Sequence, residues 1–206
     1  MPRRRQDDNP GDALNPLLKK LSPTATNMIR MDHTHVLATF HQYEADTHPK
    51  TKQALVNTVA VALEIHAQLE EEIFYPAVRR VVTDPVVIDK SVPEHDEMRR
   101  LIARLREMTP GDAEYDRTFM ELMRDVIHHV ADEETVLLPA AERMLADELG
   151  ELGAKMTKRR LELSAPRAGE IAGNTLRALP ASTMLMGVGA ALAGSLLLKR
   201  AMRRRA

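Results

Sequence analysis

The sequence predicts an all-α protein whose main part is an up-down four-helix bundle. Three observations predict this architecture. The helix formers Ala, Leu, Glu, Arg and Met dominate, whereas alternating β-branched residues are scarce. Apolar residues recur every three or four positions along four long segments, which is the helical period. The connections between these segments are short, and short connections make neighbouring helices antiparallel.

Composition limits the classes of function that remain open. The chain of 206 residues is long enough for one domain with a substantial core and an additional segment. Its formal net charge of −1 gives no general reason for nucleic-acid binding, so we expect no nucleic-acid partner. Cysteine is absent, which excludes disulfides, thiol nucleophiles, iron–sulfur clusters and thiolate zinc sites. Frequent methionines and few aromatic residues predict an aliphatic, Met-rich core.

The chain begins with a segment that has no regular pattern. Residues 1–22 contain Pro2, Pro10, Gly11 and Pro16, and we expect them to form a mobile arm. No apolar run follows the first arginines, so the arm is not predicted to be a secretory signal peptide.

Start and stop signals divide the predicted bundle, residues 23–163, into helices. A Ser-Pro-Thr start signal precedes the first helix, and the turn Thr109-Pro-Gly-Asp112 precedes the fourth. Pro76 is expected to kink or end the second helix, and Pro139 to interrupt the fourth. The patterns predict helices over about residues 23–47, 50–75, 93–108 and 112–138, followed by an extra C-terminal helix over 152–163.

The end of the chain has a different composition. Residues 164–178 are expected to form a linker, and no charged residue then occurs as far as Leu198. About 20 uncharged residues match the span of a bilayer core. We therefore expect residues 179–206 to form a hydrophobic tail helix with a basic end. This tail would anchor a cytoplasmic bundle in a membrane. The alternative is a soluble cytoplasmic protein whose tail is buried in a homo-oligomer or against the bundle.

Two copies of a His-x-x-x-Glu pattern are the main chemical signal in the sequence. His66 and Glu70 lie about one turn apart on the apolar face of the second helix, so an imidazole and a carboxylate can bind one metal centre. His129 and Glu133 repeat this pattern 63 residues later, and a proline follows each glutamate by six residues. Polar groups on a core-facing stripe are costly unless they are paired or bind a metal.

A single histidine precedes each copy of the pattern. His33 and His95 are 62 residues apart, and an acidic residue stands directly before each of them. The matched spacing predicts two related helix pairs whose polar side chains converge at one level of the bundle. The candidate metal ligands are His33, His66, Glu70, His95, His129 and Glu133.

The ligand set indicates the kind of metal. Four imidazoles and two carboxylates suit a pair of first-row metal ions bridged by the carboxylates. Iron or manganese suits the imidazoles better than calcium or magnesium does. Six ligands are too many for one closed tetrahedral zinc site, although a single zinc bound by a subset of them stays open.

Other polar residues near these positions are assigned to different roles. Surface or supporting positions are expected for His35, His41 and His128. A solvated acidic face is expected for Glu71, Glu72 and Glu134. The three tyrosines can serve near a redox site, but the sequence does not place them; they are Tyr43, Tyr75 and Tyr115.

The ordered pattern His, His-x-x-x-Glu, His, His-x-x-x-Glu resembles the hemerythrin-like HHE cation-binding family. The resemblance covers about residues 22–163 and includes the local sequences Asp32-His33, Glu94-His95 and Leu138-Pro139. The sequence Leu152-Gly-Ala-Lys-Met156 resembles the extra helix that often follows this domain. The resemblance implies a non-haem di-iron centre inside a four-helix bundle, with oxo or hydroxo and carboxylate bridges.

The sequence departs from the oxygen-carrying hemerythrins at the site. Arg99 stands where those proteins have a further histidine, and their last helix has a longer His-to-Asp spacing than His129 to Glu133. Fewer protein ligands leave more open metal positions, which favours chemistry with oxygen, peroxide or nitric oxide, or the sensing of iron. The six-ligand pattern also resembles the di-iron iron–sulfur repair proteins, but their cysteine-bearing N-terminal segment is absent here.

Two classes of function follow from this pattern. The preferred one is a di-iron protein that binds or senses oxygen, nitric oxide or iron, because the sequence shows no substrate-pocket motif and no electron-donor domain. The alternative is a di-iron redox enzyme that consumes peroxide or another small oxidant. Whether the protein is an enzyme stays open at this point.

Overall fold

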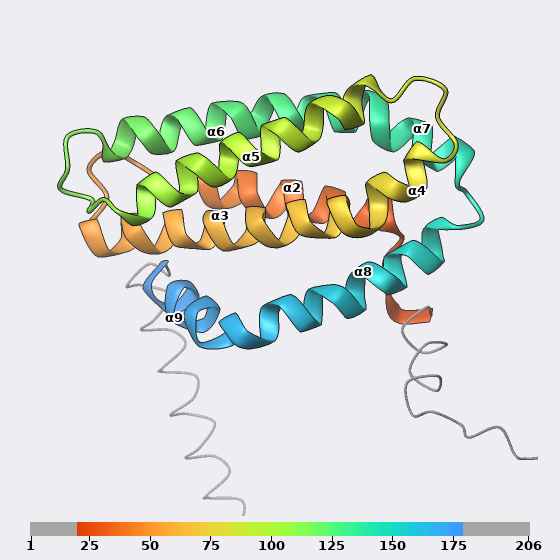
Figure 1. Cartoon of the computed structure of the whole chain (residues 1–206). Coiled ribbons are helices and arrows are strands. Elements are labelled where there is room, and N and C mark those ends of the chain that lie inside the picture. Colours follow the sequence, from red (N-terminus) through yellow and green to blue (C-terminus); the bar gives the residue numbers. More distant parts are fainter. Residues whose placement is uncertain (1–19, 179–206) are drawn as a thin grey trace, which may run out of the picture.

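A computed structural model describes residues 20–178 of the chain. Over these residues the protein is all-α, and four long antiparallel helices form a bundle (Figure 1), which confirms the predicted fold class. The helices of the bundle are α2 (Ala25–Phe40), α3 (Pro49–Leu69), α5 (Val86–Arg106) and α6 (Tyr115–Asp132). The short helices α4 (Tyr75–Arg79) and α7 (Leu138–Met144) extend α3 and α6 at one end of the bundle.

The first helix begins as predicted but ends earlier. The Thr24 side chain accepts a hydrogen bond from the backbone N–H of Asn27 and caps the start of α2. The helix stops at Phe40, not near residue 47. The turn that follows brings the buried Tyr43 hydroxyl to Asp116 of α6, and this contact fastens the loop to the end of the bundle.

The third helix of the bundle, α5, is longer than the sequence predicted. It begins at Val86, not near Pro93, and Pro93 lies inside it. The Asp84 carboxylate accepts a hydrogen bond from the Val86 N–H at the start of the helix. The added turns bury Ile88 and Ser91 against the bundle, and this tertiary contact outweighs the helix-breaking tendency of the proline.

The two helices that carry the His-x-x-x-Glu patterns change pitch at the glutamate. Segments η1 (Glu70–Phe74) and η2 (Glu133–Leu137) are π-helical, and the Tyr75 N–H donates to the Glu70 carbonyl five residues earlier. The wider turn accommodates the proline that follows, so the chain remains helical through Pro76 and Pro139. Such π turns occur frequently at functional sites.

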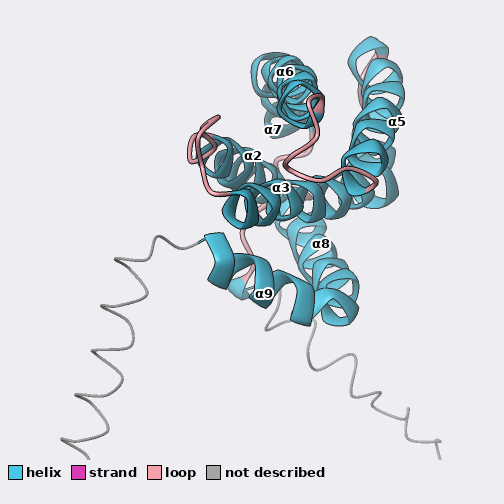
Figure 2. Cartoon of the chain, turned by 90° about the vertical axis from the view of Figure 1, so that its left-hand side faces the viewer, coloured by secondary structure: helices cyan, strands magenta, loops and turns pink. Residues whose placement is uncertain are grey.

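Helices α8 (Leu149–Ser164) and α9 (Ala168–Ala178) cross the outer face of α2 and α3, joined by the 3-10 turn η3 (Ala165–Arg167) (Figures 1 and 2). Helix α8 is the predicted extra helix, and it begins at Leu149. The linker expected over residues 164–178 is instead helical. Helix α9 crosses α3 and packs on it, with Ile171 and Ala178 reaching the apolar core (Figure 2).

The apolar core consists of two clusters with a polar layer between them. On α2, Ile29 belongs to one cluster and Val36 to the other, with His33 between them. On α6, Val126 belongs to the cluster of Val36, and on η2, Leu137 belongs to the cluster of Ile29. The second His-x-x-x-Glu pattern lies between these two residues. The helices therefore bring the candidate ligands together in the middle of the bundle.

Within residues 20–178, no helix combines the length and the apolar character that crossing a membrane requires. The predicted tail helix, residues 179–206, lies outside the described part of the chain, as does the predicted mobile arm up to residue 19.

Gly153 provides a test of how α8 docks onto the bundle. A Cβ atom at this position would lie 2.0 Å from the Pro23 carbonyl oxygen, which is a backbone atom that cannot rotate away. We expect Gly153→Ala to lower the free energy of unfolding by about 1–3 kcal/mol, measured by chemical denaturation. Gly150→Ala is the matched control, because nothing lies within 4 Å of its added Cβ. Equal stability of the two variants would contradict this packing.

Candidate metal centre

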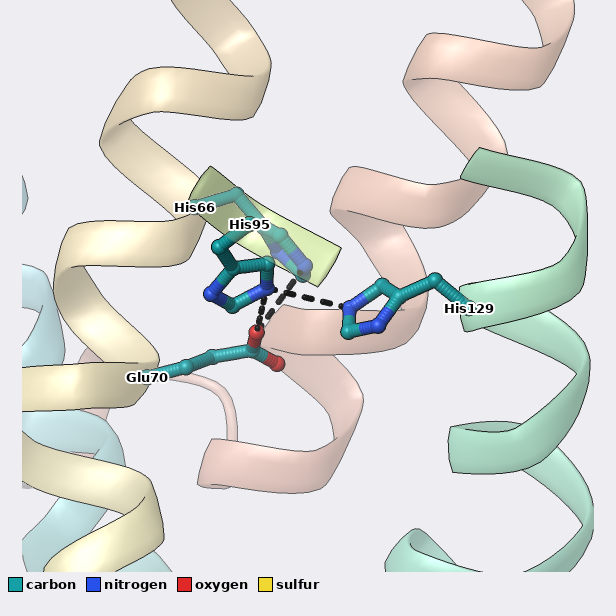
Figure 3. Close-up of side chains that lie close together, drawn as sticks. All are labelled: His66, Glu70, His95 and His129. Carbon is teal, nitrogen blue, oxygen red and sulfur yellow. Dashed lines mark hydrogen bonds and ion pairs between the residues drawn. The ribbon is translucent and has the colours of Figure 1, made fainter. Parts of the chain in front are cut away.

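The structure brings all six predicted ligands into one buried layer. Their side chains come from all four long helices and from the two π turns, and each residue is at most 4% exposed. Two overlapping groups have ligand atoms within 4.8 Å of one another. The groups are His66, Glu70, His95 and His129 (Figure 3), and His33, His66, Glu70 and Glu133.

The four imidazoles of the layer form two pairs. The His33 and His66 rings lie 5.1 Å apart, and the His95 and His129 rings 4.7 Å apart. Each glutamate lies between these two pairs. Glu70 Oε2 is 3.2 Å from His66 Nε2 and 3.4 Å from His95 Nε2. Glu133 Oε2 is 3.2 Å from His33 Nε2 and 3.5 Å from His129 Nε2, so both carboxylates are positioned to bridge the pairs.

The outer nitrogen of every imidazole faces a second carboxylate. Three of these contacts are hydrogen bonds, and the fourth is a longer ion-pair contact. Because an ionised carboxylate only accepts hydrogen bonds, the Nδ1 atoms of His33, His95 and His129 donate in the three hydrogen bonds, which turns the Nε2 atoms toward the centre. The Nδ1–oxygen distances are 2.8 Å for His33–Glu134, 2.8 Å for His95–Glu71, 2.9 Å for His129–Glu94 and 3.5 Å for His66–Asp32.

A cationic side chain holds each of these supporting carboxylates in turn. Arg99, one helical turn after His95 on α5, donates to both oxygens of Glu71. Arg160 binds Asp32 from helix α8, outside the four-helix bundle. The other two contacts are Arg30 with Glu134 and Lys90 with Glu94.

The prediction of a solvated acidic face is therefore wrong for Glu71 and Glu134. Both side chains turn inward to an imidazole of another helix. The sequence contained a usable signal, since these two residues are also 63 positions apart. Glu72 does lie at the surface, where it pairs with Arg159.

The buried ionisable groups at the centre are strongly perturbed. Burial lowers the pKa of His33, but contact with Glu133 and Glu134 outweighs it and raises that pKa to about 9. Burial lowers the pKa of His66 to about 4. Burial and the charge of Glu133 raise the pKa of Glu70 well above its usual value. Burial also raises the pKa of Glu133, but contact with His33 and the charges of the nearby His129 and His66 outweigh it and lower that pKa to about 2. Two carboxylates this close compete for charge, and a bound cation would stabilise both in the ionised form.

Buried atoms without hydrogen-bond partners also fit a cation. Glu70 Oε1, Glu133 Oε2 and His33 Nε2 are fully covered and make no hydrogen bond. The short distance between His33 Nε2 and Glu133 Oε2 lacks hydrogen-bond geometry. Groups that are buried at this cost and are rich in lone pairs are those that bind metals.

Tyr75 is a site residue that the sequence named but did not locate. Its buried hydroxyl lies 2.8 Å from Glu133 Oε1 and 3.0 Å from Glu70 Oε2. Its ring stacks on that of His95. The π turn sets this position, because Tyr75 is the residue immediately after η1. The equivalent residue of the other half, 63 positions on, is Leu138, so the two halves of the site differ here.

The remaining histidines lie away from the centre. They are all exposed: His35, His41, His48 and His128. Tyr43 lies at the far end of α2, where its hydroxyl contacts Asp116.

Fold and site together define a helical-bundle protein with a buried His/Glu site for metal cations. Comparison with known families agrees, because the family described as the Hemerythrin HHE cation binding domain matches residues 24–141. The chain belongs to this family, as the ordered His and Glu pattern indicated.

Two known proteins show how far this similarity extends. A DNA nickase from Nostoc sp. strain PCC 7120 is 30% identical over 122 residues, which are 59% of this chain and 34% of the relative. The chain thus spans about a third of that protein's length. The crystal structure of a hemerythrin HHE cation binding domain-containing protein from Mycobacterium kansasii aligns with a TM-score of 0.61 at 19% identity. The alignment covers 76% of this chain and 99% of the other, and it shows a shared fold.

Glu71 tests whether the supporting carboxylates matter for cation binding. Removing this carboxylate with Glu71→Ala leaves the His95 Nδ1 without its partner, and we expect cation affinity to fall roughly 10–100-fold. Competition with a chelator measures the affinity. Glu97→Ala is the control, since Glu97 pairs with Arg100 at the surface. Equal losses in both variants would show that Glu71 has no special role.

Proposed function

We propose that this protein holds two non-haem iron ions and uses them to bind or sense a small ligand such as oxygen or nitric oxide, or iron itself. The proposed ligands are His33, His66, Glu70, His95, His129 and Glu133. One observation carries the proposal: each of the two carboxylates lies between two separate imidazole pairs.

The donor set favours iron over the other metals considered. Four neutral imidazoles with two carboxylates suit a first-row ion such as iron, with manganese as the less favoured choice. A structural zinc ion takes four ligands in a closed tetrahedron, which would leave part of this buried layer unused. When bound, the iron pair would supply open positions for a small ligand and the capacity to change oxidation state.

The surroundings of the site support a small ligand over a large substrate. All six proposed ligands are buried, and Arg99 turns to Glu71 and thus contributes no further donor to the centre. A centre with few protein ligands, enclosed by the bundle, suits molecules of two or three atoms.

Tyr75 favours the alternative function, a di-iron redox enzyme that consumes peroxide or another small oxidant. Its hydroxyl is buried against both bridging carboxylates. A phenol in this position can donate a hydrogen bond, and it is held by stacking on His95. The Tyr75 hydroxyl could donate a hydrogen bond to a reduced oxygen species. A site that only binds a small ligand has less need of such a donor.

The similarity to a DNA nickase raises a further possibility. That relative is three times as long as the matched region, so its nicking activity is a separate hypothesis for this chain. The sequence predicts no nucleic-acid partner, and this stays a prediction. Relaxation of a supercoiled plasmid by the iron-loaded protein would contradict it.

Membrane anchorage by residues 179–206 also stays a prediction, together with a tail-mediated homo-oligomer. The proposed location is a cytoplasmic bundle fixed to a membrane by its tail, with a soluble cytoplasmic protein as the alternative. Extraction of the full chain with and without detergent distinguishes the two.

Iron content tests the proposed centre. We expect two irons per chain in the full protein and the same content after removal of residues 179–206, because every proposed ligand lies within the described bundle. Metal analysis of the purified protein measures this. Less than one iron per chain, with zinc in its place, would overturn the di-iron proposal.

Ligand chemistry separates binding from catalysis. We expect a stable nitric oxide or oxygen adduct, observed spectroscopically, with no catalytic loss of peroxide. Rapid peroxide consumption that disappears in Glu70→Ala would favour the enzyme instead. Tyr75→Phe is the sharper variant, since it keeps the stacked ring and removes the hydroxyl. Slower peroxide loss at unchanged iron content would assign that hydroxyl a role in turnover.

A further inference from the structure

A cavity of about 220 Å³ lies between the C-terminal helices and the outer face of α2 and α3. We call it the C-terminal cavity and define it by Thr58, Ile65, Arg160, Ile171, Asn174 and Thr175. It is smaller than the roughly 300–1,000 Å³ typical of drug-sized ligands, so a molecule bound there would be small.

One wall of the cavity carries a hydrogen-bonding group without a partner. Asn174 on α9 is only 4% exposed, and its Nδ2 group is buried with no hydrogen-bond partner. A buried amide is costly to leave unpaired, and this one lies in a helix that the sequence did not predict. A ligand with an acceptor oxygen would satisfy the Asn174 N–H.

Two hydroxyl groups supply the complementary acceptors. Thr58 and Thr175 each donate their hydroxyl hydrogen to a carbonyl four residues earlier in their own helix, at 2.8 Å. Because those hydrogens are used, the oxygen lone pairs remain to accept a hydrogen bond. The cavity thus combines a free donor with acceptors, beside the apolar side chains of Ile65 and Ile171.

The charges at the cavity cancel each other. Arg160 binds both oxygens of Asp32, and both residues line the cavity. A charged ligand would therefore find no unpaired Asp, Glu, Lys or Arg on the cavity wall, where His35 is the remaining ionisable side chain, and burying an unpaired charge is unfavourable. A neutral ligand avoids this penalty.

We propose that the C-terminal cavity binds a small neutral molecule with adjacent hydrogen-bond donor and acceptor groups, as in an amide or a lactam. The acceptor oxygen pairs with Asn174, the N–H group pairs with a threonine hydroxyl, and the hydrocarbon part packs on the isoleucines. None of the six proposed metal ligands lines this site. The two sites share Asp32, which also faces His66.

Binding of δ-valerolactam to the full-length protein tests this assignment. Titration calorimetry should show saturable binding in the millimolar range. Cyclohexanone has the same ring size and carbonyl but lacks the N–H, and cyclopentanecarboxylate adds a charge. We expect each of these two probes to bind at least about tenfold more weakly than the lactam.

Variants of the cavity wall complete the test. Asn174→Leu should weaken lactam binding at least about tenfold, whereas Asn57→Leu, the same change next to the wall residue Thr58, should leave it unchanged. Thr175→Val is a second variant, at an exposed position, and it should also weaken binding. Absence of lactam binding would overturn the proposal. Equal binding of the three probes, or unchanged binding in both wall variants, would also overturn it.

Discussion

The burial of four imidazoles and two carboxylates at the centre of a small helical bundle is the constraint on which the rest of the structure depends. Such groups are costly in an apolar interior unless each has a partner. The chain meets this requirement with an outer layer of acids that face the Nδ1 atoms and a further layer of cations that hold the acids. Breaking one member would leave a buried charge or imidazole unpaired, so the layers depend on one another.

The outer acids also connect the helices into a closed ring. Asp32 links α2 to α3, and Glu71 links the end of α3 to α5. Glu94 then links α5 to α6, and Glu134 returns from the end of α6 to α2. The acid before each single histidine, Asp32 or Glu94, faces the imidazole on the other helix of its own pair. The acid after each glutamate ligand, Glu71 or Glu134, faces an imidazole of the opposite pair. The same side chains therefore orient the imidazoles and fix the positions of the four helices.

The C-terminal helices, which lie outside the region that matches the family, contribute a side chain that supports the metal centre. The family match ends at residue 141, yet Arg160 of α8 holds the acid that faces His66. Close contact between Gly153 and the start of α2 fixes α8 in this position. Helix α9 then encloses the C-terminal cavity, whose wall includes the same Arg160 and Asp32. The docking of these helices thus contributes to both sites.

The sequence by itself determined the fold class and the six central residues that the structure brings together. The helical period of the apolar residues and the 63-residue repeat of His and Glu are both visible in the sequence itself. Neither depends on which segments pack against each other. The tertiary structure decided what depends on contacts between distant segments. Burial of Ile88 carries α5 through Pro93, and docking on α3 makes residues 168–178 helical. The sequence did not predict the π turns, and the turn η1 brings Tyr75 to both carboxylates. Glu71 and Arg99 have roles that only their neighbours across the bundle define, since a side chain's partner is set by packing and not by its position in the chain.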